Sequence, residues 1–398
     1  MIHYSEYTLR NGLRVVANRD RLSALAAVNM LYGVGARNEA PERTGFAHLF
    51  EHLMFRGTKL VPDFDMPVQV ACGENNAFTN NDYTDYYMTL PKDNIETALW
   101  LESDRMTGLD ITPEKLAAEK SVVVEEYKQR YLNQPYGEQW LLLRALAYKV
   151  HPYRWPTIGL TPDHIREATL ADAVSGDIEP ERVFELADKW FGHLESVPAP
   201  ADAFPQEPVQ REARREEACR DVPATQVTVA LHMGGRRSPE YYCCDVMTDL
   251  LAGGTSARLY NELVKRRRLF SAVNSYITGD IDPGLFILTG QLMPGVELRE
   301  GEEALWNQLE RLCSEPVGDD ELQKVRNKFE ANMLYGEMNV MNKALNLAYY
   351  ALLGELPLVN SELEIYRGVE AGQIMETARR LFRRDRSSTL VIYGKHGE

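Results

Sequence analysis

The pattern of apolar and polar positions occurs twice along the chain. Residues 26–39 and 226–240 both begin as an apolar strand, reach closely spaced glycines and continue into a polar loop. This order is typical of a strand that turns and leads into a helix. A strand followed by a helix with an Ala-Leu-Trp sequence also recurs, at residues 86–100 and 285–306. Because similar elements return in the same order about 200 residues later, the pattern predicts an internal duplication.

A segment without regular hydrophobic periodicity separates the two copies. Residues 196–217 are rich in proline, alanine and charged side chains, a composition that does not suit one helix or strand. We therefore predict two homologous domains, at residues 1–200 and 218–398, joined by a linker at 201–217. Each half mixes strands with long amphipathic helices, so we expect an α+β fold in which each domain is a mostly antiparallel sheet packed with helices.

Two histidines and a glutamate lie close together in one predicted helix. The helix has Thr44 as a possible cap and Gly57 as a stop signal, with no proline between them. His48 and His52 are four residues apart, so both rings leave one face of the helix at the spacing that two ligands of a tetrahedral zinc require. Glu51 lies on the adjoining edge, within reach of a metal-bound water. The order H-x-x-E-H is that of the inverted zincins.

The alternative interpretation is a helix whose histidines satisfy hydrogen bonds in the core. Two histidines and a glutamate on a mostly apolar helix would be costly to bury without a cation or other partners. The pattern therefore favours a metal site, and a catalytic zinc usually takes three protein ligands and leaves one position for water.

The third ligand is expected from a second helix, which begins with Thr112 as its cap and Pro113 in its first turn. Glu119 and Glu126 are seven residues apart and share a face of this helix, whereas Glu125 is rotated by about 100°. We select Glu126 as the ligand and Glu119 as the carboxylate that orients a ligand histidine. Without the histidine pair, these acids would be read as a solvated face.

Composition and charge exclude several classes of protein. Of the 398 residues 44% are hydrophobic and 26% are charged, which is typical of a soluble globular enzyme, and the net charge of −15 argues against nucleic acid or anionic membrane as a partner. No run of about 20 apolar residues could span a bilayer. The five cysteines include no C-x-x-C pair, and the first residues lack a signal sequence, so we expect reduced thiols and a cytoplasmic location.

The chain resembles the pitrilysin and insulinase family of zinc peptidases, in particular the half-size members related to the mitochondrial processing peptidase. The matching stretches are residues 10–16, 45–58, 73–79, 119–126, 151–153 and 253–260. The resemblance implies one Zn²⁺ per chain, bound by His48, His52 and Glu126. It also implies that Glu51 is the general base of peptide hydrolysis.

The resemblance also has implications for substrates and partners. Asn76, Ala77 and Phe78 match the strand edge on which family members lay an extended peptide, although alone they would equally suit a polar turn. Family members enclose unfolded peptides between two clam-shell halves. One chain of this length supplies one half, so a homodimer is expected, or a heterodimer with a related chain.

Two departures from the family pattern leave alternatives open. In the family, an Arg and a Tyr help to hold the substrate, and their positions are occupied here by Val264 and Ser271. A partner chain can supply this pair, or residues 266–268 or Tyr276 can replace it. Residues 169–177 are also too short to hold the helix and strand start expected there. The alternatives are a non-catalytic peptide-binding or assembly subunit, and the zinc-bearing subunit of a heteromeric peptidase.

Overall fold

The computed structural model describes residues 1–166, 168, 181–194 and 204–394, and the segment 169–177, which we expected to be shortened, lies outside them. The chain forms two compact units, each assembled from separate stretches of sequence. The first unit comprises Met1–Tyr127, Trp155–Phe204 and Met333–Glu362, and the second comprises Lys128–Arg154, Pro205–Asn332 and Leu363–Glu398. Each unit contains its own sheet and helices, as expected for an α+β fold.

The first unit has two small antiparallel sheets. One pairs β1 (Tyr4–Thr8) with β2 (Arg14–Asn18), and the other has the order β3-β5-β4, built from β3 (Leu25–Tyr32), β4 (Glu74–Thr79) and β5 (Thr84–Pro91). Its helices include the following segments: α1 (Phe46–Leu53), α2 (Asp65–Val70), α3 (Ile95–Thr107), α4 (Pro113–Tyr127), α6 (Pro162–Arg166), α7 (Glu181–Phe191) and α11 (Val340–Leu353). The short 3₁₀ helices are η1 (Ala36–Asn38) and η2 (Lys92–Asn94).

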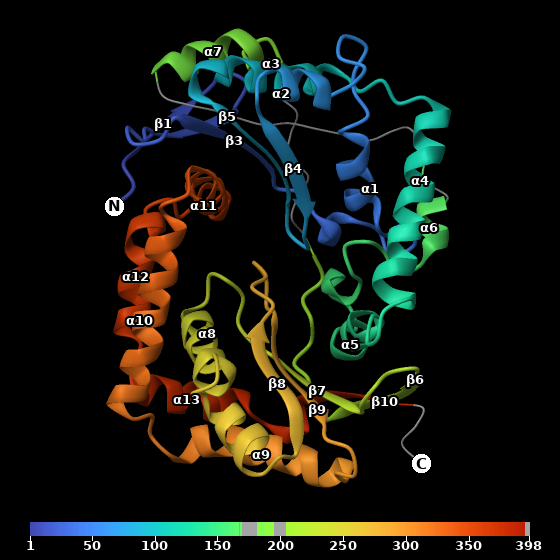
Figure 1. The fold of residues 1–398 in the computed structure, drawn as a ribbon, viewed down its shortest axis with the longest axis vertical. Coiled ribbons are helices and arrows are strands. Elements are labelled where there is room, and N and C mark those ends of the chain that lie inside the picture. Colours follow the sequence, from blue (N-terminus) through green and yellow to red (C-terminus); the bar gives the residue numbers. More distant parts are fainter. Residues whose placement is uncertain (167, 169–180, 195–203, 395–398) are drawn as a thin grey trace. The chain divides into compact units, whose positions relative to one another are not determined.

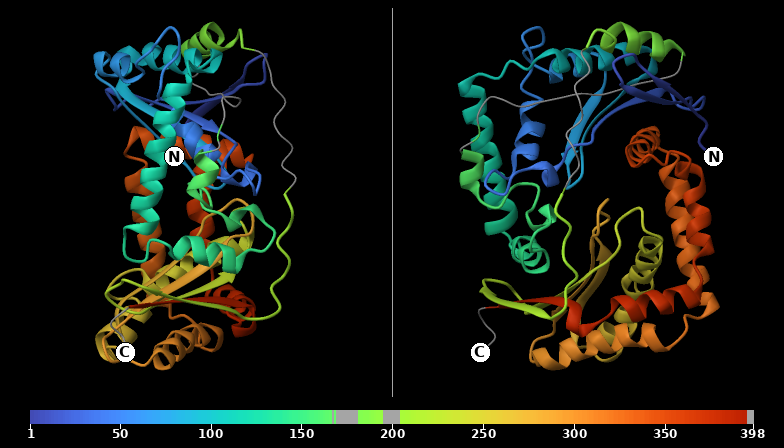
Figure 2. Two further views of the ribbon diagram at one scale, coloured as in Figure 1. Left: turned by 90° about the vertical axis from the view of Figure 1, so that its right-hand side faces the viewer. Right: turned by 180° about the vertical axis from the view of Figure 1, so that it is seen from behind.

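The core of the first unit lies between the three-stranded sheet and helix α3. Side chains alternate across a strand, so Met30 of β3 and Met88 of β5 point to one face, where they are buried with Leu99 of α3. Figures 1 and 2 show α2, α3 and α7 together on this face and α11 on the other. The strand order leaves β4 at the edge of the sheet, and among the described residues it pairs with β5 alone.

The second unit repeats this strand order within a larger sheet. Its order is β6-β10-β7-β9-β8, so β7-β9-β8 corresponds to β3-β5-β4, and the sheet is antiparallel except for the pairing of β10 with β6. The strands are β6 (Arg214–Arg220), β7 (Gln226–His232), β8 (Phe270–Ile277), β9 (Leu285–Leu292) and β10 (Ser387–Gly394). The repeated order agrees with the predicted duplication.

The second unit also has its own set of helices. They are α5 (Gln139–Ala147), α8 (Pro239–Ala252), α9 (Leu298–Ser314) and α13 (Ala371–Leu381), the π-helices η3 (Lys128–Leu132) and η5 (Tyr260–Arg266), and the 3₁₀ helices η4 (Pro152–Arg154) and η6 (Arg384–Arg386). Helices α10 (Asp319–Gly336) and α12 (Leu358–Gly368) contribute residues to both units. No described helix combines the length and the apolar composition that crossing a bilayer requires.

The units do not follow the predicted boundaries at residues 200 and 218. Helix α5 belongs to the second unit because Leu143 and Ala147 are buried against Leu390 of β10. Helix α11 belongs to the first because it packs on β3, and its Lys343 forms an ion pair with Asp20 at 2.6 Å. These exchanges depend on contacts between distant segments, which a division in sequence order does not capture.

The predicted linker at 201–217 also needs a correction. Residues 201–203 lie outside the described residues, but residues 214–217 form the beginning of β6. This strand pairs in parallel with β10, from Arg214 opposite Ser388 to Arg220 opposite Gly394. Its side chains alternate between half-buried and exposed, and the strand lies at the edge of the sheet. At this position a charged sequence can form a strand, which is why the prediction of a linker up to residue 217 was wrong.

Candidate metal centre

Helix α1 carries the histidine pair, but it begins differently from the prediction. Thr44 does not cap it, because this side chain is buried, lies 2.8 Å from His164 Nδ1 and accepts a hydrogen bond from the Leu160 N–H at 2.8 Å. The N-cap is Gly45, in the left-handed region with a φ of 88°. The helix ends at Leu53, ahead of the predicted stop at Gly57.

The two histidine rings lie side by side on α1. The ring centroids of His48 and His52 are 4.8 Å apart, and their planes meet at 69°. His48 is buried and His52 is half-buried. The four-residue spacing therefore gives the shared face that the sequence predicts.

Helix α4 brings a carboxylate to the same point. The prediction of its start is confirmed, since the helix begins at Pro113 and the Thr112 hydroxyl accepts a hydrogen bond from the Lys115 N–H at 3.3 Å. Helix α4 packs against α1, and Glu126 Oε2 lies 3.6 Å from His48 Nε2 and 3.4 Å from His52 Nε2.

The distances from Glu126 to the two histidines suit a tetrahedral metal ion. Among the described residues, His48, His52 and Glu126 form the one group of histidine, cysteine and acidic side chains whose ligand atoms all lie within 4.8 Å of one another. Zinc bonds of about 2.0–2.2 Å in a tetrahedron give ligand-to-ligand distances of about 3.3–3.5 Å, close to those from Glu126 to the two histidines. Two imidazole nitrogens and one carboxylate oxygen form a common donor set of catalytic zinc sites. The neighbouring Glu125 is exposed.

A second carboxylate contacts His52 at its other ring nitrogen, Nδ1. Glu119 Oε2 lies 3.1 Å from His52 Nδ1, and the other Glu119 oxygen pairs with the guanidinium of Arg56. Burial acts to raise the pKa of Glu119, but the hydrogen bonds from His52 and Arg56 outweigh it and hold this pKa below its usual value. Glu119 therefore has the contacts expected of a residue that fixes the orientation of a ligand histidine.

His52 lies between two carboxylates. Burial acts to lower its pKa, but hydrogen bonds to Glu119 and Glu126 prevail and raise the pKa to about 9. Without a metal ion, this arrangement holds a proton on His52 at neutral pH. A metal ion binding at Nε2 must displace that proton, so its affinity depends on pH.

Glu51 connects α1 with strand β4. Its Oε2 accepts a hydrogen bond from the Thr79 hydroxyl at 2.6 Å, and Thr79 is the last residue of β4. Asn76, Ala77 and Phe78 lie on the same strand, opposite Tyr87, Tyr86 and Asp85 of β5. The residues predicted to bind a substrate thus lie on an edge strand that is joined to the predicted base.

Three residues that contact α1 or the side chains around the metal position were not predicted from the sequence. Arg56 follows His52 by four residues within the predicted helix, which was the signal for it, although α1 itself ends at Leu53. Thr79 belongs to the matched stretch 73–79 but was not selected. Glu39, whose carboxylate accepts hydrogen bonds at the start of α1, lies in a loop that gave no signal.

The two positions at which the resemblance implied an Arg and a Tyr lie in the second unit. Val264 lies in η5, and Ser271 is an exposed residue of β8 that donates to the Gln291 carbonyl at 3.2 Å. Of the side chains considered as replacements, Arg266 pairs with Glu262 at 2.7 Å and Tyr276 packs against Trp140.

Comparisons with known proteins identify the family of this chain. Residues 14–157 match the family model described as insulinase, peptidase family M16, and residues 163–329 match the model described as peptidase M16 inactive domain. The zinc protease PqqE of Helicobacter pylori is 27% identical over 411 residues, which cover 98% of this chain and 92% of that protein. A probable mitochondrial-processing peptidase subunit beta of Schizosaccharomyces pombe is 27% identical over 312 residues, which cover 70% of this chain and 67% of that protein.

A solved structure extends the similarity to the whole fold. The crystal structure of a protease from Helicobacter pylori matches with a TM-score of 0.91 at 27% identity, over 98% of this chain and 100% of that one. The two family models match in chain order, and a relative of similar length aligns along nearly the whole sequence. The chain therefore belongs to the insulinase family of peptidases, M16.

Proposed function

We propose that this chain is a zinc-dependent endopeptidase that hydrolyses extended or unfolded peptides, with one zinc ion per chain. The observation that carries the proposal is the convergence of the His48, His52 and Glu126 donor atoms within 4.8 Å. Both histidines lie on α1, which also carries Glu51. Relatives named as zinc proteases support the same activity.

The chemistry follows from the properties of the residues. When bound to His48, His52 and Glu126, zinc supplies a Lewis acid and a water of lowered pKa. Glu51 accepts a proton from the attacking water and returns it to the leaving amine, as a general base and then a general acid. The hydrogen bond from Thr79 fixes the orientation of the Glu51 carboxylate that moves the proton. Glu119 keeps His52 oriented through Nδ1, so that Nε2 faces the metal position.

The edge strand β4 explains why an extended peptide is the proposed substrate. A peptide that pairs with the outer edge of β4, which is unpaired among the described residues, is held mainly through its main chain, so binding depends little on sequence. Asn76, Ala77 and Phe78 would form this edge beside Glu51. A folded protein has few unpaired main-chain groups to offer and would be a poor substrate.

We also propose that the chain works as a dimer, with a second copy or with a related chain. The S. pombe relative is named as a subunit, which is the observation that favours a heteromeric arrangement. Val264 and Ser271 also favour a heteromeric arrangement, because a related partner chain could supply the missing Arg and Tyr. The cytoplasmic location stays a prediction.

A non-catalytic peptide-binding subunit is the remaining candidate, also because of Val264 and Ser271. The purified single chain is incubated with a peptide library, and products are followed by mass spectrometry with and without a chelator. The endopeptidase proposal predicts cleavage that the chelator stops and added zinc restores. A Glu51→Gln variant should bind zinc without cleaving, and Glu125→Gln, at an exposed position beside a ligand, should behave as wild type.

If the wild-type chain binds peptides but never cleaves them, the non-catalytic subunit is correct. If cleavage appears only after a related chain is added, the heteromeric arrangement is correct.

A further inference from the structure

We infer that Glu39 is a positioning residue for the metal centre. Its carboxylate replaces the side-chain cap that α1 lacks and ties this helix to the hairpin of β4 and β5. This inference rests on the proposed function, because it concerns the helix that carries His48, Glu51 and His52.

The start of α1 cannot be capped by its own residues. A helix leaves its first N–H groups without partners, and a Ser, Thr, Asp or Asn side chain at the N-cap usually accepts from them. Gly45 occupies the N-cap here, and a Cβ added to it would lie 2.5 Å from the Ile158 carbonyl oxygen and 2.5 Å from Ile165 Cδ1. With a φ of 88° as well, this position requires glycine, and no side chain can cap from it.

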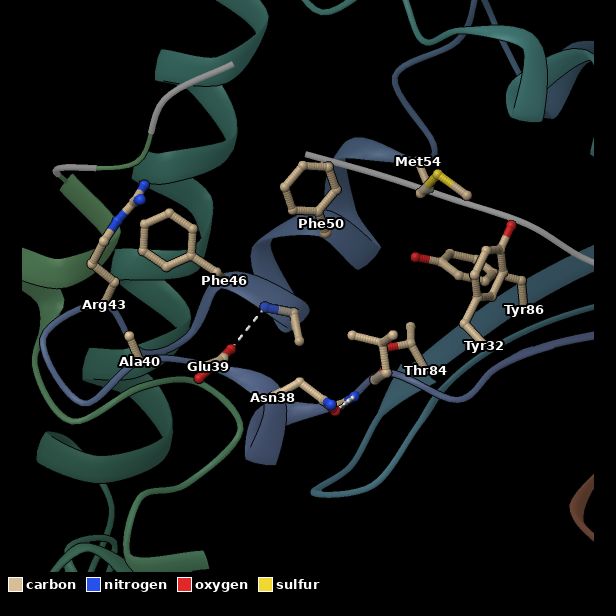
Figure 3. Close-up of a pocket in the computed structure, with 13 residues that line it drawn as sticks. Tyr32, Asn38, Glu39, Ala40, Arg43, Phe46, Phe50, Met54, Thr84 and Tyr86 are labelled. Atoms are coloured by element: carbon tan, nitrogen blue, oxygen red, sulfur yellow. Dashed lines mark hydrogen bonds between the residues drawn. The ribbon is translucent and has the colours of Figure 1, made fainter. Parts of the chain in front are cut away.

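Glu39 supplies both acceptors from six residues upstream. Its Oε2 accepts from the Gly45 N–H and its Oε1 accepts from the Ala47 N–H, each at 2.8 Å. Figure 3 shows the Glu39 side chain directed at the start of α1. A carboxylate at this end also interacts favourably with the helix dipole. Ala47 directly precedes His48, so the cap acts one residue from a proposed ligand.

The segment that precedes Glu39 is itself fixed to the turn between β4 and β5. The Ala36 N–H donates to the Asn80 carbonyl at 3.0 Å, and the Arg37 N–H donates to the Asn81 carbonyl at 2.8 Å. Arg37 also forms a buried ion pair with Asp82 at 3.0 Å. Glu39 therefore joins the N-terminus of α1 to the end of the substrate-edge hairpin.

Thr79 makes the second connection between α1 and this hairpin, through Glu51. Together the two connections set the direction of the metal ligands and of the base relative to strand β4. The cap matters because α1 has only eight residues and one side of it faces a pocket. Phe46, Phe50 and Met54 follow each other at four-residue spacing on the side away from His48, and there they line a pocket of about 500 Å³ (Figure 3).

The test compares Glu39→Gln with the matched control Glu42→Gln, an exposed position in the same loop. Glutamine has the size of glutamate but replaces one acceptor oxygen with an NH₂ donor, which cannot accept from either N–H. Burial raises the pKa of Glu39 to about 8, although the N–H donors of α1 act to lower it. The measurements are therefore made above that pH, where Glu39 is a carboxylate. Zinc affinity is measured by chelator competition with the metal alone, and kcat and KM with a cleavable peptide.

We expect Glu39→Gln to weaken zinc binding by roughly tenfold or more, the range found when groups that orient metal ligands are removed. The value of kcat should fall by a similar factor, while KM stays within about twofold because β4, not α1, holds the peptide. Glu39→Asp keeps both acceptor oxygens and should recover part of the zinc affinity and of kcat. Glu42→Gln should equal the wild type in all three measurements.

Unchanged zinc affinity and kcat in Glu39→Gln would overturn the inference. A parallel rise in KM with no change in zinc affinity would also contradict it, because that result assigns Glu39 to substrate binding. If Glu39→Gln does not fold, Glu39→Asp is compared with the control, and wild-type values in that variant would overturn the inference. A wild-type chain that binds zinc but cleaves nothing would contradict the proposed function alone, since zinc affinity still tests the cap.

Discussion

The Thr79 hydroxyl donates to Glu51 at 2.6 Å, which joins the last residue of the edge strand to the proposed general base. A carboxylate on a short helix can adopt several rotamers, and this bond selects one of them. The base is therefore aligned by the element that is proposed to hold the peptide.

The Thr79–Glu51 bond gives the first prediction. Thr79→Val removes the hydroxyl, keeps the side-chain shape and suits a strand. A hydrogen bond to a charged group contributes about 1.5–3 kcal/mol, so kcat should fall by roughly tenfold or more. Zinc content should not change, because no proposed ligand is altered. Thr79→Ser keeps the donor and should retain most of kcat; equal kcat in the Val and Ser variants would show that the bond does not align the base.

The second prediction concerns the support of His52. Glu119→Gln removes the negative charge that faces His52 Nδ1 and Arg56. Loss of such a partner typically lowers metal affinity or activity by about 10–100-fold. Chelator competition measures the affinity, and Glu114→Gln, an exposed position in the first turn of α4, is the matched control. If Glu119→Gln binds zinc with the affinity of the wild type, Glu119 does not support His52 as a metal ligand.

The third prediction is a pH dependence of stability in the metal-free protein. The folded state raises the pKa of His52 to about 9, from about 6.5 in the unfolded chain. The folded state therefore keeps a proton that the unfolded state releases. The resulting stabilisation is fully present below about pH 6.5 and is lost as the pH rises through about 9, with a size on the order of 2 kcal/mol.

The measurement is the free energy of unfolding of wild type minus that of His52→Gln, across this pH window and without metal. Burial raises the pKa values of Glu39 and Asp85 to about 8, which gives the stability a pH slope of the same sign. This slope is present in both proteins, so it cancels in the difference and leaves the contribution of His52. A difference that does not change with pH would contradict the raised pKa. Zinc should flatten the slope, because the metal displaces the His52 proton.

The fourth prediction tests the edge strand. The Ala77 N–H donates to the side chain of Asn76 at 2.8 Å, and a peptide that pairs at this residue would replace Asn76 as the acceptor. Ala77→Pro removes this N–H, and an edge strand tolerates proline. If a peptide pairs at this residue, the substitution should raise KM by several fold. Ala77→Ser keeps the N–H and is the control. Wild-type KM in the proline variant would exclude main-chain pairing at this residue.

Much of the candidate site follows from helical geometry alone. Four-residue spacing brings His48 and His52 together, and seven-residue spacing on α4 distinguishes Glu126 and Glu119 from the exposed Glu125. The recurring apolar pattern likewise predicts the internal duplication, with which the shared strand order of the two sheets agrees. These features depend on periodicity within single elements, which the sequence displays directly.

Other features depend on contacts that periodicity does not encode. Thr44 is a good cap by residue type, yet its hydroxyl is used by His164 and Leu160 in the fold. Glu39 caps α1 across a loop, with no helical or strand spacing to reveal it. The exchange of α5 and α11 between the units arises in the same way, since each helix packs on the sheet of the unit it joins.

The central claim is that His48, His52 and Glu126 hold one zinc ion whose water is activated by Glu51. The most direct measurement is zinc content per chain together with peptide cleavage, in wild type, in Glu51→Gln and in the double variant His48→Ala, His52→Ala. The account predicts about one zinc with cleavage in wild type, about one zinc without cleavage in Glu51→Gln, and neither in the double variant. Full zinc content in the double variant, or undiminished cleavage by Glu51→Gln, would contradict it.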